Sequence, residues 1–271
     1  MRGGNAWWSR LLDLLERGLG PGGDACLWCG AARRGRPAFP PDASPSALRA
    51  MERLCGACAS GIPWIARPLC PACGRAEACG DCARRAVSHI VANRAAVRYT
   101  PMMKEMLARY KYRGSERLAP LFGDMACAAY ERLSSDAWRS ETPPRARAAL
   151  TFVPLSERRL EERGFNQAEA MAAYVGRRFR APVLPLLSRT RHTEKQSYKT
   201  RRERLESLDR AFALRDDGAA ELERLLRSGP VRLVIVDDVY TTGSTMQRCG
   251  ATVAERFGSN GLSIYGLTWA R

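Results

Sequence analysis

Two adjacent carboxylates followed by a hydroxyl-rich turn are the side chains best suited to chemistry in this chain. Asp237 and Asp238 come directly after the apolar run 233–236. The turn that follows offers hydroxyls and approachable backbone N–H groups from Thr241, Thr242, Gly243, Ser244 and Thr245. Carboxylates can bind sugar hydroxyls or a divalent cation, whereas N–H groups at the start of a helix favour an anion. The pattern therefore predicts a site that holds a sugar together with its phosphate.

The elements around these residues predict how they are positioned. An apolar run such as 233–236 is typical of a parallel strand covered on both faces, and ligands bind beyond the carboxyl ends of such strands. Apolar residues then recur at helical spacing from 246 to 257, and Gly258 ends that helix. With a further strand at 262–269, the order predicts an α/β fold whose parallel sheet is flanked by helices.

The string from 233 to 245 resembles the phosphoribosyl pyrophosphate signature of type I phosphoribosyltransferases. The resemblance implies that Asp237 and Asp238 bind the ribose hydroxyls and that the Thr/Gly turn wraps the 5′-phosphate. The string is not a Walker loop, because no Gly-Lys-Ser/Thr ending is present. The alternative interpretation is a structural helix cap, since Ser and Thr cap helices in many proteins.

A basic loop after a second strand is the expected counterpart of this site. The strand is predicted at about 149–153, and the polar residues of the loop are Ser156, Arg158, Arg159 and Arg163. Arginine can bind pyrophosphate oxygens through paired N–H groups. The alternative interpretation is a solvated basic turn.

Further cations lie in two other segments. Lys111 belongs to the string YKYRG at 110–114, and Lys195 and Arg191 belong to the segment 188–200. We expect Lys111 and Lys195 to take part in catalysis by stabilising pyrophosphate charge. The segment 188–200 can close as a lid that excludes water.

Eight of the ten cysteines form four Cys-x-x-Cys pairs, which are typical of metal knuckles. The sequential pairing gives one cysteine set of Cys26, Cys29, Cys55 and Cys58 and a second of Cys70, Cys73, Cys79 and Cys82. A cross-braced pairing is the alternative. Two tetrahedral sets of thiolates predict two structural Zn²⁺ ions, and an iron–sulfur cluster or disulfides are the competing interpretations.

The charge of the chain indicates polyanionic partners. The 271 residues carry a net charge of +16, and ten basic residues against two acids lie between 177 and 204. A pyrophosphate-bearing substrate, nucleic acid, or both fit this balance. The sequence shows no apolar run of membrane-spanning length and no signal peptide, so we expect a cytoplasmic protein that is not an integral membrane protein.

Taken in order, the cysteine module and the strings YKYRG, RGFNQAEA (163–170) and DDVYTTGST (237–245) resemble the ComF competence family. The resemblance implies an N-terminal extension at 1–25, a double zinc-ribbon module at 26–86 and a phosphoribosyltransferase-like domain at 87–271. It also implies a link with DNA uptake, and with it the DNA-uptake machinery as partners. By the same resemblance the loop 154–163 meets pyrophosphate. Lys199 and Ser207 depart from the family pattern.

Two functional hypotheses follow. The first is a Mg²⁺-dependent phosphoribosyltransferase whose acceptor the sequence does not identify, because Thr241 stands where purine enzymes carry an acidic base. The second is a catalytically degenerate accessory protein that binds single-stranded DNA along 177–204 and uses the pocket as a sensor.

Overall fold

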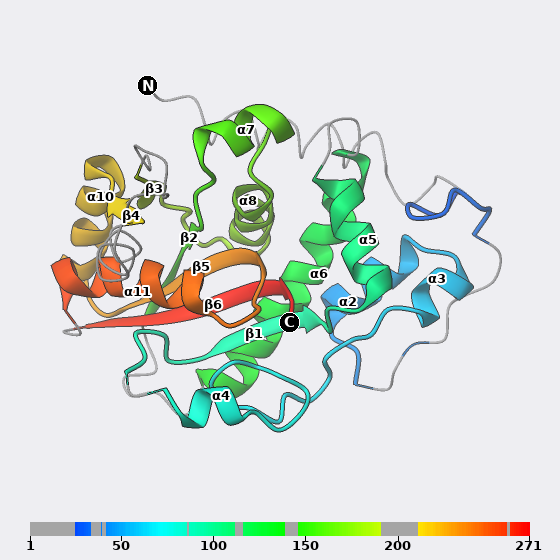
Figure 1. Cartoon of the computed structure of the whole chain (residues 1–271), viewed down its shortest axis with the longest axis horizontal. Coiled ribbons are helices and arrows are strands. Elements are labelled where there is room, and N and C mark those ends of the chain that lie inside the picture. Colours follow the sequence, from blue (N-terminus) through cyan, green and yellow to red (C-terminus); the bar gives the residue numbers. More distant parts are fainter. Residues whose placement is uncertain are drawn as a thin grey trace, which may run out of the picture.

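The computed structural model describes residues 25–33, 39, 42–85, 87–111, 116–138, 146–190, 211–258 and 261–271 (Figure 1). Residues 1–24 of the predicted N-terminal extension, Lys195 and Arg191, and the second half of the basic segment 177–204 lie outside these ranges. No helix within the ranges is long and apolar enough to cross a membrane.

The centre of the molecule is a sheet of four parallel strands in the order β1-β6-β5-β2. The strands are β1 (Asn93–Val97), β2 (Arg147–Phe152), β5 (Val231–Val239) and β6 (Leu262–Ala270). β5 is longer than the apolar run predicts, because its pairing with β6 continues through Asp237 opposite Thr268. The sequence-based prediction of a parallel sheet is confirmed.

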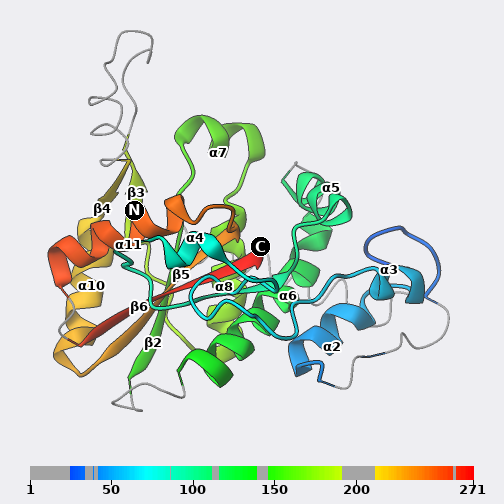
Figure 2. The ribbon, with the colours of Figure 1, turned by 60° about the horizontal axis from the view of Figure 1, so that its bottom comes forward.

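Helices cover both faces of the sheet, as the continuous apolar run in β5 predicts. Val234 and Val236 pack into one hydrophobic cluster with α5 (Pro101–Tyr110), α6 (Ala119–Arg132) and α8 (Gln167–Phe179). Leu233 and Ile235 pack into the other, with α10 (Asp216–Arg227) and α11 (Ser244–Phe257). The alternation follows from the two-residue period of a strand, and α10 and α11 lie at the opposite end of the molecule from α5 (Figure 2).

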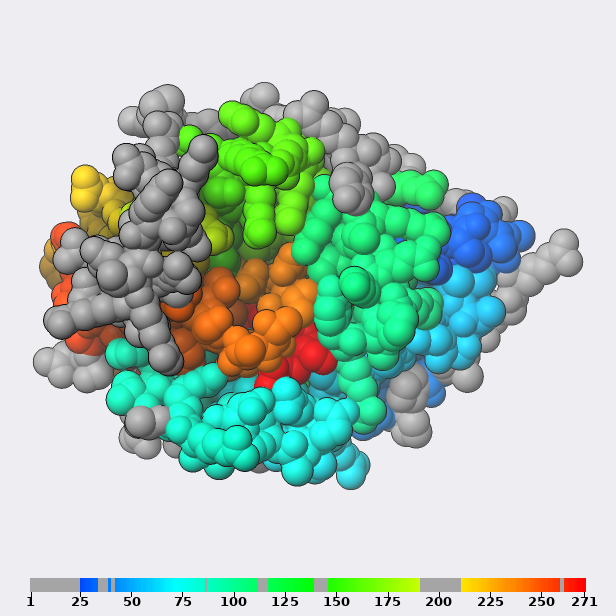
Figure 3. All heavy atoms as spheres, viewed as in Figure 1, coloured from blue at the N-terminus to red at the C-terminus, as the bar shows by residue number. Residues whose placement is uncertain are grey.

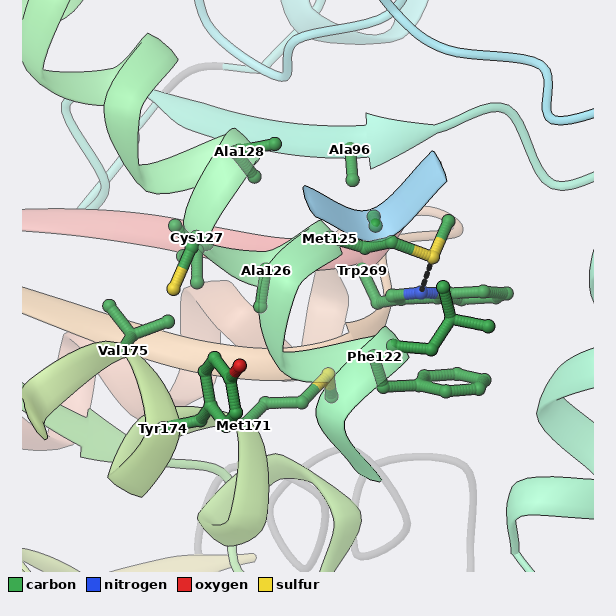
Figure 4. Packing of buried hydrophobic residues seen from close by; sticks show 14 of the residues in the cluster. Ala96, Phe122, Met125, Ala126, Cys127, Ala128, Met171, Tyr174, Val175 and Trp269 are labelled. Atoms are coloured by element: carbon green, nitrogen blue, oxygen red, sulfur yellow. Dashed lines mark hydrogen bonds between the residues drawn. The ribbon is translucent and has the colours of Figure 1, made fainter. Parts of the chain in front are cut away.

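Aromatic residues pack α6 against the sheet. The ring centroids of Phe122 and Trp269 lie 4.5 Å apart, and the indole N–H of Trp269 donates to the sulfur of Met125 at 3.3 Å (Figure 4). Tyr110 stacks on Phe122 from the other side, with centroids 4.1 Å apart. These contacts fix the end of α5, and with it the backbone next to Lys111.

The cysteine-rich region shares its core with the sheet. Its helices are α2 (Pro45–Glu52), α3 (Gly56–Ser60) and α4 (Gly80–Ala83), and Met51 of α2 lies in the same hydrophobic cluster as α6. Asp124 of α6, only 1% exposed, accepts from Arg53 at 2.7 Å, from Arg49 at 3.4 Å and from the Tyr174 hydroxyl at 3.0 Å. This buried network ties α2 to α6, and the boundary predicted near residue 86 stays a prediction.

The remaining elements connect these layers. They are η1 (Glu116–Leu118), the π-helix η2 (Leu133–Ala137), α7 (Glu157–Arg163), and the strands β3 (Leu187–Arg189) and β4 (Phe212–Leu214). β3 and β4 form a separate antiparallel pair. Arg189 ends β3, and the described residues stop one position later, before the gap at 191–210.

Candidate functional site

The candidate site lies at the carboxyl end of β5, where the strand passes into α11. In the space-filling view this region is the floor of a hollow between α7, α5 and the segment that carries α4 (Figure 3). A pocket at the start of α11 is lined by Asp237, Val239, Tyr240, Thr241, Gly243, Ser244, Thr245 and Met246. The structure thus brings together the first carboxylate and most of the predicted hydroxyl-rich turn.

The loop at 240–243, called here the β5–α11 loop, has a conformation that its glycine makes possible. Gly243 has φ +80° and caps α11, and a Cβ there would stand 2.2 Å from the ring of Tyr240. Thr242 Oγ1 accepts from the backbone N–H of Ser244 at 3.4 Å and donates to its hydroxyl at 3.1 Å. The loop therefore ends at the N-terminus of a fourteen-residue helix, whose dipole favours an anion.

The two carboxylates stand in different environments. Lys111, at the end of α5, places its Nζ 2.7 Å from Oδ2 of Asp238. Asp237 accepts the backbone N–H of Asp238 at 2.8 Å. Burial and the charge of Asp238 raise the pKa of Asp237 to about 8, against the opposing effect of Lys111 and Arg189. Asp238 is therefore ion-paired, whereas burial and its charged neighbour favour the protonated form of Asp237.

The predicted pyrophosphate loop is a short helix. Ser156 caps α7 by accepting the N–H of Arg159 at 3.4 Å, and Arg158 pairs with Glu162 one turn along at 2.8 Å. Arg163 donates to Gln167 at 2.9 Å. Ser156 and these arginines therefore make contacts within or next to α7. Their role toward pyrophosphate stays a prediction.

The structure adds two residues that the sequence-based set omits. Arg189 lies close enough to Asp237 for each charge to act on the other, and burial and the neighbouring charge of Arg159 lower its pKa. Tyr99 follows β1, and burial and the charge of Asp238 raise its pKa. Tyr99 comes from the carboxyl end of a parallel strand, which is a signal that could have identified it. Arg189 needs the fold, because β3 lies outside the main sheet.

The eight paired cysteines gather as the sequential pairing predicts. The sulfurs of Cys26, Cys29, Cys55 and Cys58 lie within 4.8 Å of one another. The same holds for Cys70, Cys73, Cys79 and Cys82. We call these the first and the second cysteine cluster.

Both clusters fit a tetrahedral metal ion. Sγ–Sγ distances are 3.7 Å for Cys29 and Cys55 and 3.6 Å for Cys73 and Cys79. A tetrahedron with metal–sulfur bonds of about 2.3 Å has edges of about 3.8 Å. The backbone N–H of Cys82 lowers the pKa of Cys79 to about 6, whereas burial raises the pKa of Cys82 to about 12. Cys127 and Cys249 are buried apart from the clusters, as expected.

These features define an α/β protein with two adjacent carboxylates and a hydroxyl-rich turn at the carboxyl edge of its sheet, and with two Cys₄ clusters that could each hold a metal ion. No protein-family model matches the chain. It is 30% identical to the competence protein ComFC of Bacillus subtilis (strain 168) over 229 residues, which cover 81% of this chain and 85% of that protein.

Two further competence proteins are similar. ComFC of Streptococcus pneumoniae is 29% identical over 202 residues, or 72% of this chain and 78% of the relative. Competence protein F of Haemophilus influenzae is 26% identical over 231 residues, or 82% of this chain and 92% of the relative. The chain belongs to the ComF family of competence proteins.

Proposed function

We propose that this protein binds phosphoribosyl pyrophosphate with Mg²⁺ at the carboxyl end of β5 and acts in competence, in the uptake or use of DNA. The observation that carries the binding proposal is the placement of Asp237, Asp238 and the β5–α11 loop at one edge of the sheet, next to Lys111. The names of three relatives support the role in competence.

Each group has a chemical task in this proposal. The carboxylates of Asp237 and Asp238 accept hydrogen bonds from the ribose hydroxyls, and N–H groups of residues 241–245 surround the 5′-phosphate. In the free protein the Nζ of Lys111 lies 2.7 Å from Asp238 and neutralises its charge. When ribose hydroxyls replace Lys111 at Asp238, the Lys111 ammonium becomes available to the phosphate oxygens. Mg²⁺ supplies charge neutralisation of the departing pyrophosphate.

The cysteine clusters complete the proposal with two structural Zn²⁺ ions. Each cluster offers four thiols and, among the described residues, no fifth His, Cys, Asp or Glu side chain, so a bound ion would have a closed shell. A closed shell is typical of a structural site and unsuited to catalysis. Zinc is favoured over an iron–sulfur cluster because the Sγ–Sγ distances suit one tetrahedral ion.

A second candidate function, binding of single-stranded DNA, rests on charge. Arg177, Arg178 and Arg180 are exposed at the C-terminal end of α8, in a chain of net charge +16. α8 comes after β2 and α7 and ends at Phe179, and the chain then reaches Val183, which pairs with Leu150 of β2. These arginines therefore lie toward the amino ends of the strands, whereas the β5–α11 loop lies at their carboxyl ends. Single-stranded DNA bound to these arginines would not enter the pocket.

Calorimetric titration of the zinc-loaded protein with phosphoribosyl pyrophosphate and Mg²⁺ tests the first candidate. Asp238→Asn should abolish saturable binding while the fold stays intact, and Asp216→Asn, an exposed aspartate of α10, is the matched control. Equal binding by wild type and Asp238→Asn would refute the proposed site. DNA affinity that does not fall with rising salt would argue against the second candidate.

A further inference from the structure

Arg271 joins the second cysteine cluster to the β5–α11 loop. Its Nη1 donates to the carbonyl oxygen of Tyr240 at 2.9 Å and also to that of Thr241. Its Nη2 donates to the sulfur of Cys73 at 3.0 Å. The guanidinium carbon lies 4.5 Å from the centroid of the Tyr240 ring. One side chain therefore contacts a metal-binding sulfur and two consecutive peptides of the loop.

Arg85, three positions after Cys82, makes a parallel connection. Its Nη2 donates to the carbonyl oxygen of Thr242 at 2.9 Å, and its Nη1 donates to the Tyr240 hydroxyl at 3.3 Å. Together the two arginines donate hydrogen bonds to the carbonyl oxygens of three consecutive residues, 240, 241 and 242. The second cluster is itself anchored to the sheet, because Asn93 of β1 donates to the carbonyl oxygen of Cys73 at 3.1 Å.

This arrangement determines where the amide groups of the loop point. In a trans peptide the N–H of one residue points away from the carbonyl of the residue before it. With the carbonyls of 240–242 directed at the two arginines, the N–H groups of 241–243 point to the opposite side. That side is where an anion at the start of α11 would lie, so the arginines preorganise the amides that would bind it.

We propose that the second cysteine cluster, once it holds its metal, positions the β5–α11 loop through Arg271 and Arg85. Four thiolates around one divalent ion carry a net charge of −2, which matches the two guanidinium groups. Arg271 and Arg85 are positioning residues, because they reach the ligand only through the loop. The consequence for phosphoribosyl pyrophosphate rests on the proposed function, whereas the consequence for the loop does not.

The first cysteine cluster provides an internal comparison. Cys26 lies in the hydrophobic cluster that contains α2 and α6, and the amide of Leu27 donates to the carbonyl of Arg53 at 3.0 Å. Within the described ranges, the hydrogen bonds around the first cluster stay in its own segment or lead to α6, and none of them reaches residues 240–243. Only the second cluster is therefore expected to couple to the loop.

Amide hydrogen–deuterium exchange of the full-length, zinc-loaded protein tests the positioning without any ligand. The amides of Tyr240 and Gln247, which donate to the carbonyl oxygens of Ala270 and Gly243, report on the two ends of the loop. Arg271→Met should raise their exchange at least about tenfold, Arg271→Lys should raise it less, and exchange in α6 should not change. Arg98→Met, which removes an exposed arginine paired with Glu77, is the control and should leave both amides unchanged. Unchanged exchange at both amides in both Arg271 variants would overturn the inference, whether or not the protein binds phosphoribosyl pyrophosphate.

A second measurement tests the coupling from the metal side. Binding is reciprocal, so a ligand that needs the ordered loop must raise the metal affinity of the cluster that orders it. In an equilibrium competition with a chromogenic chelator, phosphoribosyl pyrophosphate with Mg²⁺ should raise the affinity for one of two Zn²⁺ ions, and Arg271→Met should remove this effect. If wild type binds the ligand and the affinities for both ions stay unchanged, the inference is wrong. If wild type does not bind it, the proposed function fails and the exchange result decides the inference.

Discussion

Replacing Gly243 by alanine should damage the protein through a specific clash. Gly243 has φ +80° and ψ +6°, which alanine adopts at a cost of about 1 kcal/mol or slightly more. The added Cβ would also stand 2.2 Å from Cζ and from the hydroxyl oxygen of Tyr240, a ring that is 4% exposed. Moving the ring out of contact loses about 2 kcal/mol of burial and about 1 kcal/mol from the hydrogen bond with Arg85. The free energy of unfolding should therefore fall by about 4 kcal/mol.

Gly164→Ala is the control that carries the backbone cost of a positive φ without the clash with a ring. Gly164 ends α7 with nearly the same conformation, φ +80° and ψ −17°, and is exposed. Alanine there should lower the free energy of unfolding by only about 1 kcal/mol. Urea unfolding followed by circular dichroism measures both variants. Equal losses in the two variants would refute the claim that Tyr240 and Gly243 define the loop.

Three further predictions follow from buried charges and the metal clusters. Asp124→Asn removes the charge of a side chain that is 1% exposed and contacts Arg49 and Arg53. The free energy of unfolding, measured by thermal unfolding, should fall by about 3 kcal/mol. A fall of less than about 1 kcal/mol would contradict the network. Asp237 has a pKa of about 8 in the free protein and, in the proposed function, must be ionised to bind Mg²⁺ and ribose. Binding at pH 7 should therefore release about one proton. The affinity should rise with pH up to about 8 and then level off. Calorimetry in two buffers of different ionisation enthalpy measures the proton, and Asp237→Asn should release none. Removal of zinc by a chelator should lower the melting temperature, and added Zn²⁺ but not Mg²⁺ should restore it, whereas an unchanged melting temperature would show that the clusters carry no structural metal.

The strand, loop and helix that form the site could be predicted because local sequence determines them. The apolar residues before Asp237 are typical of a strand covered on both faces, and Gly243 and Gly258 mark the two ends of α11. The four Cys-x-x-Cys pairs also follow from spacing, since two residues between cysteines let both sulfurs face one ion, whereas the choice between sequential and cross-braced clusters needed the fold.

Other parts of the site could not be predicted, because they depend on contacts between distant segments. Arg85 and Tyr240 are 155 positions apart, and Arg271 and Cys73 are 198 apart. No local pattern separates Arg85 or Arg271 from the many other arginines of this basic chain. α7 was expected as a loop because its residues are nearly all charged. The cap by Ser156 and the pair of Arg158 with Glu162 stabilise it as a helix instead.

A crystal structure of the zinc-loaded protein with phosphoribosyl pyrophosphate and Mg²⁺ tests the central claim most directly. The account predicts that the 5′-phosphate lies within hydrogen-bond distance of the N–H groups of 241–245 and that the ribose hydroxyls face Asp237 and Asp238. Lys111 should have left Asp238, from which it lies 2.7 Å in the free protein. Ligand bound elsewhere on the molecule, with the Lys111–Asp238 pair intact, would contradict the account.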